Sequence, residues 1–231
     1  MTSITASDSL SINVRSPSNV GDTSSRVTTW ARLAHLNEMR GNLDEAASML
    51  ERALDPGYSG VSSADARSWC RAVLGEVEQQ RGHPERSRPL YEKGLQETPD
   101  HLLVLEHFAE FEQSEGHLAA SEALYRRILA IHEDPKAELR LAALLETRGE
   151  RVEAAKLRAE ARRFYERAVA SGNDGYLRPL AVMELAAGRY ERAESLQARD
   201  VALRPTHESR GVLQTIQDAA AAAGRPLPKS K

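Results

Sequence analysis

Five glycines recur along the chain at a nearly constant interval, and this interval limits the possible folds more than any other feature of the sequence. They stand at Gly41, Gly82, Gly116, Gly149 and Gly188, which are 41, 34, 33 and 39 residues apart. A period close to 34 residues is typical of repeated helix–turn–helix units. The spacing therefore predicts a row of stacked units, each of which buries its apolar face against its neighbours.

Side chains of matching size surround each glycine. Eight residues before it stands a large apolar residue, and a small one follows: Leu33-Ala34, Leu74-Gly75, Phe108-Ala109, Leu141-Ala142 and Leu180-Ala181. Five residues after it the chain is small again, at Ala46, Ser87, Ser121, Ala154 and Ala193. Antiparallel helices approach closely only where small side chains face each other, and a glycine suits the left-handed turn between them. We therefore predict an all-α solenoid of about five helical hairpins.

These residues resemble the tetratricopeptide-repeat (TPR) family between about Arg26 and Pro205, and the resemblance implies a right-handed superhelix. The repeat with Leu74-Gly75, Gly82, Tyr91 and Pro99 matches the family pattern best. The line Phe108-Ala109-Glu110-Phe111-Glu112 with Gly116 is also similar to the related half-a-TPR (HAT) variant. That variant is associated with RNA-processing scaffolds, so it implies a different function for the same architecture.

The repeats are flanked by tails and interrupted at a few points. We expect residues 1–25 to be a disordered Ser/Thr-rich tail, 26–223 to be the solenoid, and 224–231 to be a disordered basic tail. A helix at about 208–223 should cap the stack. The first long interval falls in the loop at 56–63, and the last predicts an extended second helix from about Val152 to Ala170. Pro89 lies inside a predicted helix, where we expect a kink.

In the TPR family, ligands lie along the concave surface formed by the first helix of each hairpin. The resemblance therefore implies a groove that contains Arg32, His35, Glu76, Gln80, Glu106, His107, Glu110, Lys136 and Arg140. Glu76, Glu106 and Glu110 would make its middle negative, which favours a basic or amphipathic peptide as the partner. Lys136 and Arg140 match part of the carboxylate clamp of chaperone-tail-binding members. The remaining clamp positions hold Ala72, Glu76 and His107, so we do not expect a complete clamp.

The sequence predicts a binding protein rather than an enzyme. It contains no nucleophile elbow, phosphate-binding glycine loop or His-Glu-x-x-His motif, and we expect no cofactor and no catalytic or metal site. The primary prediction is a scaffold or adaptor that binds a protein or peptide. An RNA-processing scaffold and an accessory subunit of an enzyme complex are the alternatives. The basic residues between Arg151 and Arg167 could contact RNA, but interleaved glutamates favour a solvated helix, so nucleic acid is not the expected partner.

Charge and cysteine content agree with a cytoplasmic protein. The formal net charge is -3, and no apolar run is long enough to cross a membrane, so we expect no membrane association. Cys70 is the single cysteine, which excludes an internal disulfide and fits a reducing compartment. No apolar segment typical of a secretory signal stands near residue 1.

Overall fold

The computed structural model describes residue 37 and residues 40–55 and 63–225, and within these residues the chain is helical without strands. The helices are α2 (Leu43–Leu54), α3 (Ala64–Gln80), α4 (Pro84–Glu97), α5 (Leu102–Ser114), α6 (Leu118–Ile131), α7 (Pro135–Thr147), α8 (Arg151–Ala170), α9 (Leu177–Ala186), α10 (Tyr190–Leu203) and α11 (His207–Ala222), with a short 3-10 helix at Asp174–Tyr176. The predicted all-α repeat architecture is confirmed.

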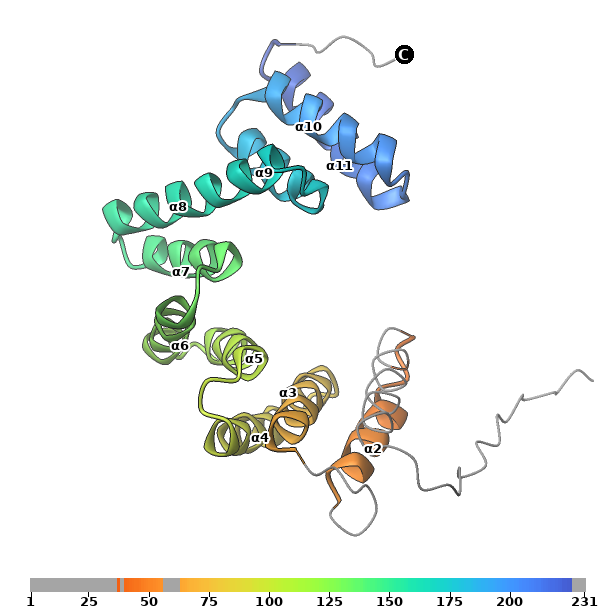
Figure 1. Cartoon of the computed structure of the whole chain (residues 1–231), viewed down its shortest axis with the longest axis vertical. Helices are drawn as coiled ribbons and strands as arrows, with labels where there is room; N and C mark the ends of the chain where they lie inside the picture. Colours follow the sequence, from red (N-terminus) through yellow and green to blue (C-terminus); the bar gives the residue numbers. More distant parts are fainter. Residues whose placement is uncertain (1–36, 38–39, 56–62, 226–231) are drawn as a thin grey trace, which may run out of the picture.

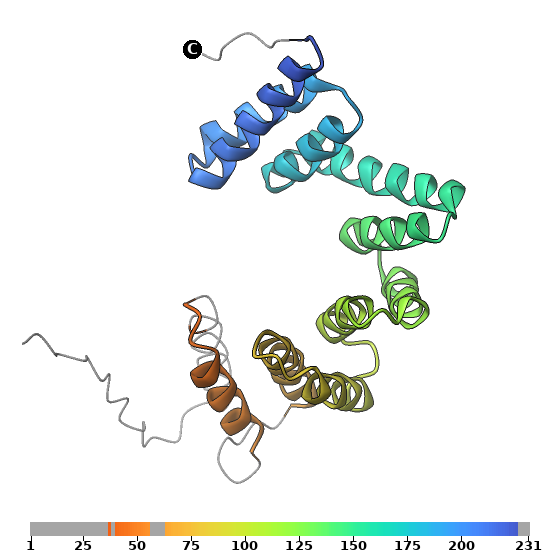
Figure 2. The same cartoon turned by 180° about the vertical axis from the view of Figure 1, so that it is seen from behind.

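The helices form an arc of antiparallel hairpins (Figure 1). Four complete hairpins are described, α3–α4, α5–α6, α7–α8 and α9–α10, and α2 packs against α3. The helices α3, α5, α7, α9 and α11 lie toward the inside of the arc, and α4, α6, α8 and α10 lie toward its outside (Figures 1 and 2). The arc therefore has a concave surface that consists of the first helix of each hairpin.

A left-handed glycine closes the first helix of each hairpin. The backbone angle φ is 76° at Gly41, 83° at Gly82, 80° at Gly116, 81° at Gly149 and 69° at Gly188. The residue after the glycine donates its N–H to the carbonyl five residues earlier, as His83 does to Glu78 at 2.8 Å. This bond satisfies a carbonyl that the helix end leaves free, and it needs a conformation that a Cβ makes costly. The glycine series therefore marks the hairpin turns.

Small residues let the two helices of a hairpin touch. In two hairpins the small residue of the second helix is a serine that donates to a buried carbonyl of the first, Ser87 to Gly75 and Ser121 to Ala109, both at 2.8 Å. Gly75 faces the ring of Tyr91, and a Cβ placed there would lie 2.6 Å from that ring. Ser87, Ser121 and Gly75 stand where the other repeats have alanine, and these contacts explain each of the three differences.

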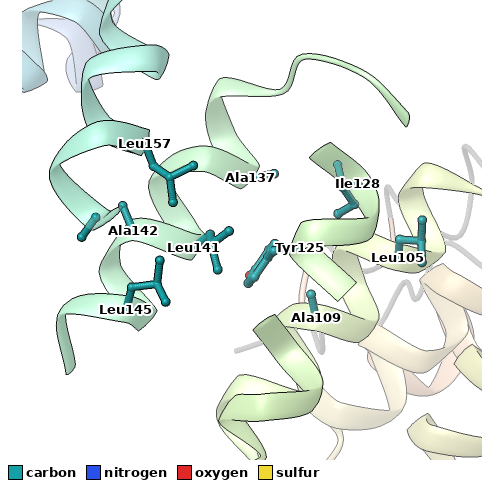
Figure 3. Close-up of a cluster of buried hydrophobic side chains, with 10 residues drawn as sticks. Leu105, Ala109, Tyr125, Ile128, Ala137, Leu141, Ala142, Leu145 and Leu157 are labelled. Atoms are coloured by element: carbon teal, nitrogen blue, oxygen red, sulfur yellow. The ribbon is translucent and has the colours of Figure 1, made fainter. Parts of the chain in front are cut away.

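The core consists of clusters that join neighbouring helices. One cluster joins α5 to α8 through Leu105, Tyr125, Ile128, Leu141 and Leu157, and Figure 3 shows these side chains converging. Because this cluster unites two successive hairpins, the two repeats stabilise each other.

Two irregularities of the repeat, the long helix α8 and the final helix α11, agree with the predictions made from the sequence. The extended helix α8 covers Arg151–Ala170. Pro89 lies inside α4, as predicted, and the kink expected there stays a prediction. The last helix, α11, begins and ends one residue before the predicted 208–223, and Ile216 and Val212 pack it on the last hairpin. The predicted tail at 1–25, and all but residues 224 and 225 of the predicted tail at 224–231, lie outside the described residues.

Candidate functional site

The concave surface carries the predicted groove residues on three successive helices. Glu76 and Gln80 lie on α3, the residues Glu106, His107 and Glu110 lie on α5, and Lys136 and Arg140 lie on α7. Arg32 and His35, predicted for the same groove, lie outside the described residues. Seven of the nine predicted positions can therefore be placed.

Six of these side chains form two groups of ion pairs between neighbouring inner helices, which we call together the concave charged row: Glu76, Glu106, His107, Glu110, Lys136 and Arg140. Lys136 Nζ pairs with Glu106 and lies 3.9 Å from Glu110 Oε1. Arg140 lies 3.1 Å from Glu110, and His107 Nδ1 lies 3.1 Å from Glu76 Oε2. Each pair joins one inner helix to the next, from α3 through α5 to α7.

A neutral hydrogen bond continues the link between the first two of these helices. Gln79 Nε2 donates to Ser114 Oγ at 2.8 Å, one turn beyond the concave charged row. Together with the pair of His107 and Glu76, this bond fixes α3 against α5 at two points. The row therefore lies on a rigid support rather than on mobile loops.

His107 is the titratable member of the row. Burial disfavours its charged form, but the hydrogen bond and the charge of Glu76, together with the charges of Glu106 and Glu110, outweigh burial and raise the pKa of His107. Protonation of the ring therefore strengthens the contact between α3 and α5.

The ion pairs change the charge that the sequence predicted for this surface. From the helices taken singly, Glu76, Glu106 and Glu110 predicted a negative groove. The structure places Lys136 and Arg140 directly against two of these carboxylates. The row thus carries three carboxylates, two permanent cations and one histidine, and it is close to neutral. This compensation could not be predicted from the sequence, because the paired side chains lie on different helices about 30 residues apart.

Three buried carboxylates, which sequence reasoning did not single out, tie neighbouring elements together. Each stands four residues before a hairpin glycine: Glu78, Glu112 and Glu184, whose side chains are at most 2% exposed. Glu112 binds Arg88 of the preceding hairpin, and Glu184 likewise binds Arg162. The signal in the sequence was the fixed offset, since a glutamate stands four residues before three of the five hairpin glycines.

The arginine-rich helix α8 is bound to carboxylates along its length. Arg158 donates to Glu146 at 2.7 Å, Arg162 lies 3.0 Å from Glu184, and Arg167 pairs with Glu133. Lys156 and Arg163 both lie within 4.0 Å of Glu160. These pairs hold the guanidinium groups against the protein, which disfavours α8 as a phosphate-binding stripe.

The single cysteine, Cys70, is buried within α3. Burial raises the pKa of the Cys70 thiol to about 11, so that the thiol remains protonated at neutral pH. In the described part of the chain, no three histidine, cysteine or acidic side chains are grouped as a metal site. No helix there is both long and apolar enough to cross a membrane.

Comparison with known proteins identifies the fold. No family model and no curated protein matches the sequence. Among solved structures, a TPR protein of Thermus thermophilus is similar at a TM-score of 0.56 and 17% identity, over 82% of this chain and 98% of that one. The TPR-like repeats of a Podospora anserina putative kinesin light chain give 0.56 and 18%, over 89% and 100%.

Yeast Tom70 is similar at a TM-score of 0.58 and 16% identity, and the match covers 87% of this chain and 41% of Tom70. At such low identity these likenesses show the fold alone. The chain has a TPR-like fold, as the resemblance in the sequence implied.

Proposed function

We propose that this chain is a non-catalytic interaction scaffold that binds a peptide or helix of a protein partner on its concave charged row. The observation that supports this proposal most directly is the row itself. Three successive inner helices contribute partly exposed charged side chains to one continuous strip of the concave surface. An extended segment or a helix laid across α3, α5 and α7 could contact all of them.

The exposure of the row fits a reversible binding surface. The side chains of Glu106 and Glu110 are 28% and 37% exposed, and those of Lys136 and Arg140 are 59% and 51% exposed. Ion pairs this accessible contribute little to folding, so a partner can exchange them at a small cost in stability. Their arrangement then determines which partner fits rather than how tightly the repeats pack.

An amphipathic partner fits this row better than a uniformly basic one. Basic side chains of the partner would compete with Lys136 and Arg140 for Glu106 and Glu110, and acidic ones would bind the two cations. An apolar position is available on the next inner helix, because Val182 on α9 is 46% exposed and stands six residues before Gly188, as Glu110 stands six residues before Gly116. A segment with both charges and an apolar stripe satisfies all three features.

The alternatives differ in how well the contacts support them. An accessory subunit of an enzyme complex would use the same surface, with an enzyme as the partner. An RNA-processing scaffold gains no support from α8, because its basic groups are paired with glutamates. We propose the cytoplasm as the location, on the single buried cysteine and the sequence charge.

A charge-swapped variant tests the proposal without breaking the row. In Glu106→Lys/Lys136→Glu the ion pair is retained with its direction inverted, so we expect the thermal midpoint to change by no more than about 2 °C. Proteins captured by the wild type from cells of the source organism should be lost from this variant by about tenfold or more.

A matched control changes the same residue types elsewhere. Lys156 and Glu160 form an ion pair on α8 in the outer layer, and Lys156→Glu/Glu160→Lys inverts that pair away from the row. This control should capture the same proteins as the wild type. Equal capture by the wild type and the Glu106→Lys/Lys136→Glu variant would show that the row does not bind the partner.

A further inference from the structure

A second groove lies between α2 and α4, on the face of α3 that points away from the concave charged row. It has a volume of about 580 Å³ and is lined by Glu51, Leu54, Asp55, Leu74, Glu78, Glu85, Arg86, Pro89, Leu90 and Lys93. Leu74 and Glu78 share one face of α3, and Glu76 points about 200° away from both. The groove and the row are therefore separate surfaces. The helices that form the groove, α2, α3 and α4, lie at one end of the arc (Figure 1).

The groove has an apolar floor. Leu74 is only 4% exposed, Leu54 and Leu90 are half-buried, and Pro89 is exposed at its edge. These four side chains come from three different helices, so the floor is continuous across the hairpin and the preceding helix. Several apolar side chains of a partner would lose contact with water there.

The rim of the groove is acidic. Glu51 on α2 and Glu85 on α4 are exposed carboxylates on opposite sides of the floor. The side chain of Glu85 is 70% exposed, and its Oε1 lies 3.7 Å from His83 Nδ1. Of the two cations in the lining, Lys93 and Arg86, Arg86 lies 3.4 Å from the buried Glu78, which Arg81 also binds. Four carboxylates and two cations line the groove in total, which gives it a negative balance.

Pro89 adds a backbone acceptor to this rim. A helical residue at position 89 would donate its N–H to the carbonyl of Glu85, but proline has no N–H. The Glu85 carbonyl is therefore without its helical donor, on the same residue that supplies a rim carboxylate. A donor-bearing cation can bind both oxygens at once.

We infer that this groove is a docking site for an amphipathic helix or extended segment of a protein partner, with an apolar face flanked by lysine or arginine. The apolar face covers Leu54, Leu74 and Leu90. The flanking cations pair with Glu51 and Glu85, and one of them donates to the Glu85 carbonyl. The scaffold then has two docking surfaces on opposite faces of α3, and two partners can bind together.

The test uses the full chain and a fluorescein-labelled helical peptide composed of leucine and lysine. Fluorescence anisotropy gives its Kd for the wild type and for Glu51→Lys/Glu85→Lys. We expect the double variant to bind about tenfold more weakly, which corresponds to about 1.4 kcal/mol. Pro89→Ala restores the missing N–H and should stabilise α4, yet it should also weaken binding. The Glu106→Lys/Lys136→Glu variant of the concave charged row should bind as the wild type does.

Several results would overturn this inference. The peptide must bind the wild type, and a matched peptide with glutamate in place of lysine must not bind comparably. An unchanged Kd in Glu51→Lys/Glu85→Lys would remove the acidic rim from the interaction. Loss of binding in the concave variant alone would assign the peptide to the proposed concave site. A wild-type dimer in sedimentation, dissociated by the rim variant, would make a second copy of this chain the occupant.

Discussion

Substitution of Gly75 by alanine tests the close helix contact on which each hairpin depends. An added Cβ would lie 2.6 Å from Cε1 and Cζ of Tyr91, which is shorter than any ordinary contact. Tyr91 is 1% exposed, stacks on Phe108 and lies tilted against Phe111, so its ring has little room to move away. Overpacking of this kind costs about 1–3 kcal/mol, and alanine returns about 0.5–1 kcal/mol in helix propensity. The difference lies between about 0 and 2.5 kcal/mol, so we expect Gly75→Ala to destabilise the chain by about 1 kcal/mol.

Urea unfolding followed by circular dichroism measures this change, and the chain offers a matched control. Gly211 also lies within a helix, but a Cβ there meets nothing within 4 Å. Gly211→Ala should therefore stabilise the protein by about 0.5–1 kcal/mol. In a Tyr91→Leu background, Gly75→Ala should lose most of its cost, because the clashing ring is gone. Equal stabilisation by both glycine substitutions would refute the steric account.

Two further predictions concern buried carboxylates. Burial and three neighbouring carboxylates raise the pKa of Glu138 from 4.5 to about 7. The folded state then holds this proton more tightly than the unfolded state does, so stability falls as pH rises from about 4.5 to 7, by up to about 3 kcal/mol. Glu138→Gln should remove this loss, which urea titrations at pH 5 and pH 8 would detect; an unchanged slope would exclude it. Glu184 lies buried among Arg162 and Arg189, and Glu184→Gln should cost about 1–3 kcal/mol. The exposed Glu191→Gln should change stability by less than about 0.5 kcal/mol, and similar costs for the two would contradict the buried-pair interpretation.

The repeat architecture could be predicted because local chemistry determines it. A left-handed glycine at the turn, two small residues that face each other across the hairpin and a large apolar neighbour are each required at a fixed offset. Those offsets survive even where the residue changes, as at Ser87, which replaces alanine and donates to the carbonyl of Gly75. The extended helix α8 was also predictable, because its apolar residues continue at a helical spacing and no glycine or proline interrupts them.

The charge of the concave surface could not be predicted in the same way. Whether Lys136 neutralises Glu106 depends on how far α7 is rotated against α5, and neither helix encodes that rotation alone. The buried carboxylates pose a similar problem. Glu112 in a sequence looks like any surface glutamate, and only its contact with Arg88 from the preceding hairpin explains its burial. Contacts between repeats thus carry the information that a single repeat lacks.

Site-specific photo-crosslinking tests the central claim most directly, because it reports which face of the arc touches a partner. Ala143 is exposed on α7, one turn beyond Arg140, and Ala130 is exposed on α6 in the outer layer. A photoreactive residue at position 143 should crosslink the captured partner, and one at position 130 should not. Crosslinking from position 130, with none from position 143, would contradict a concave binding surface.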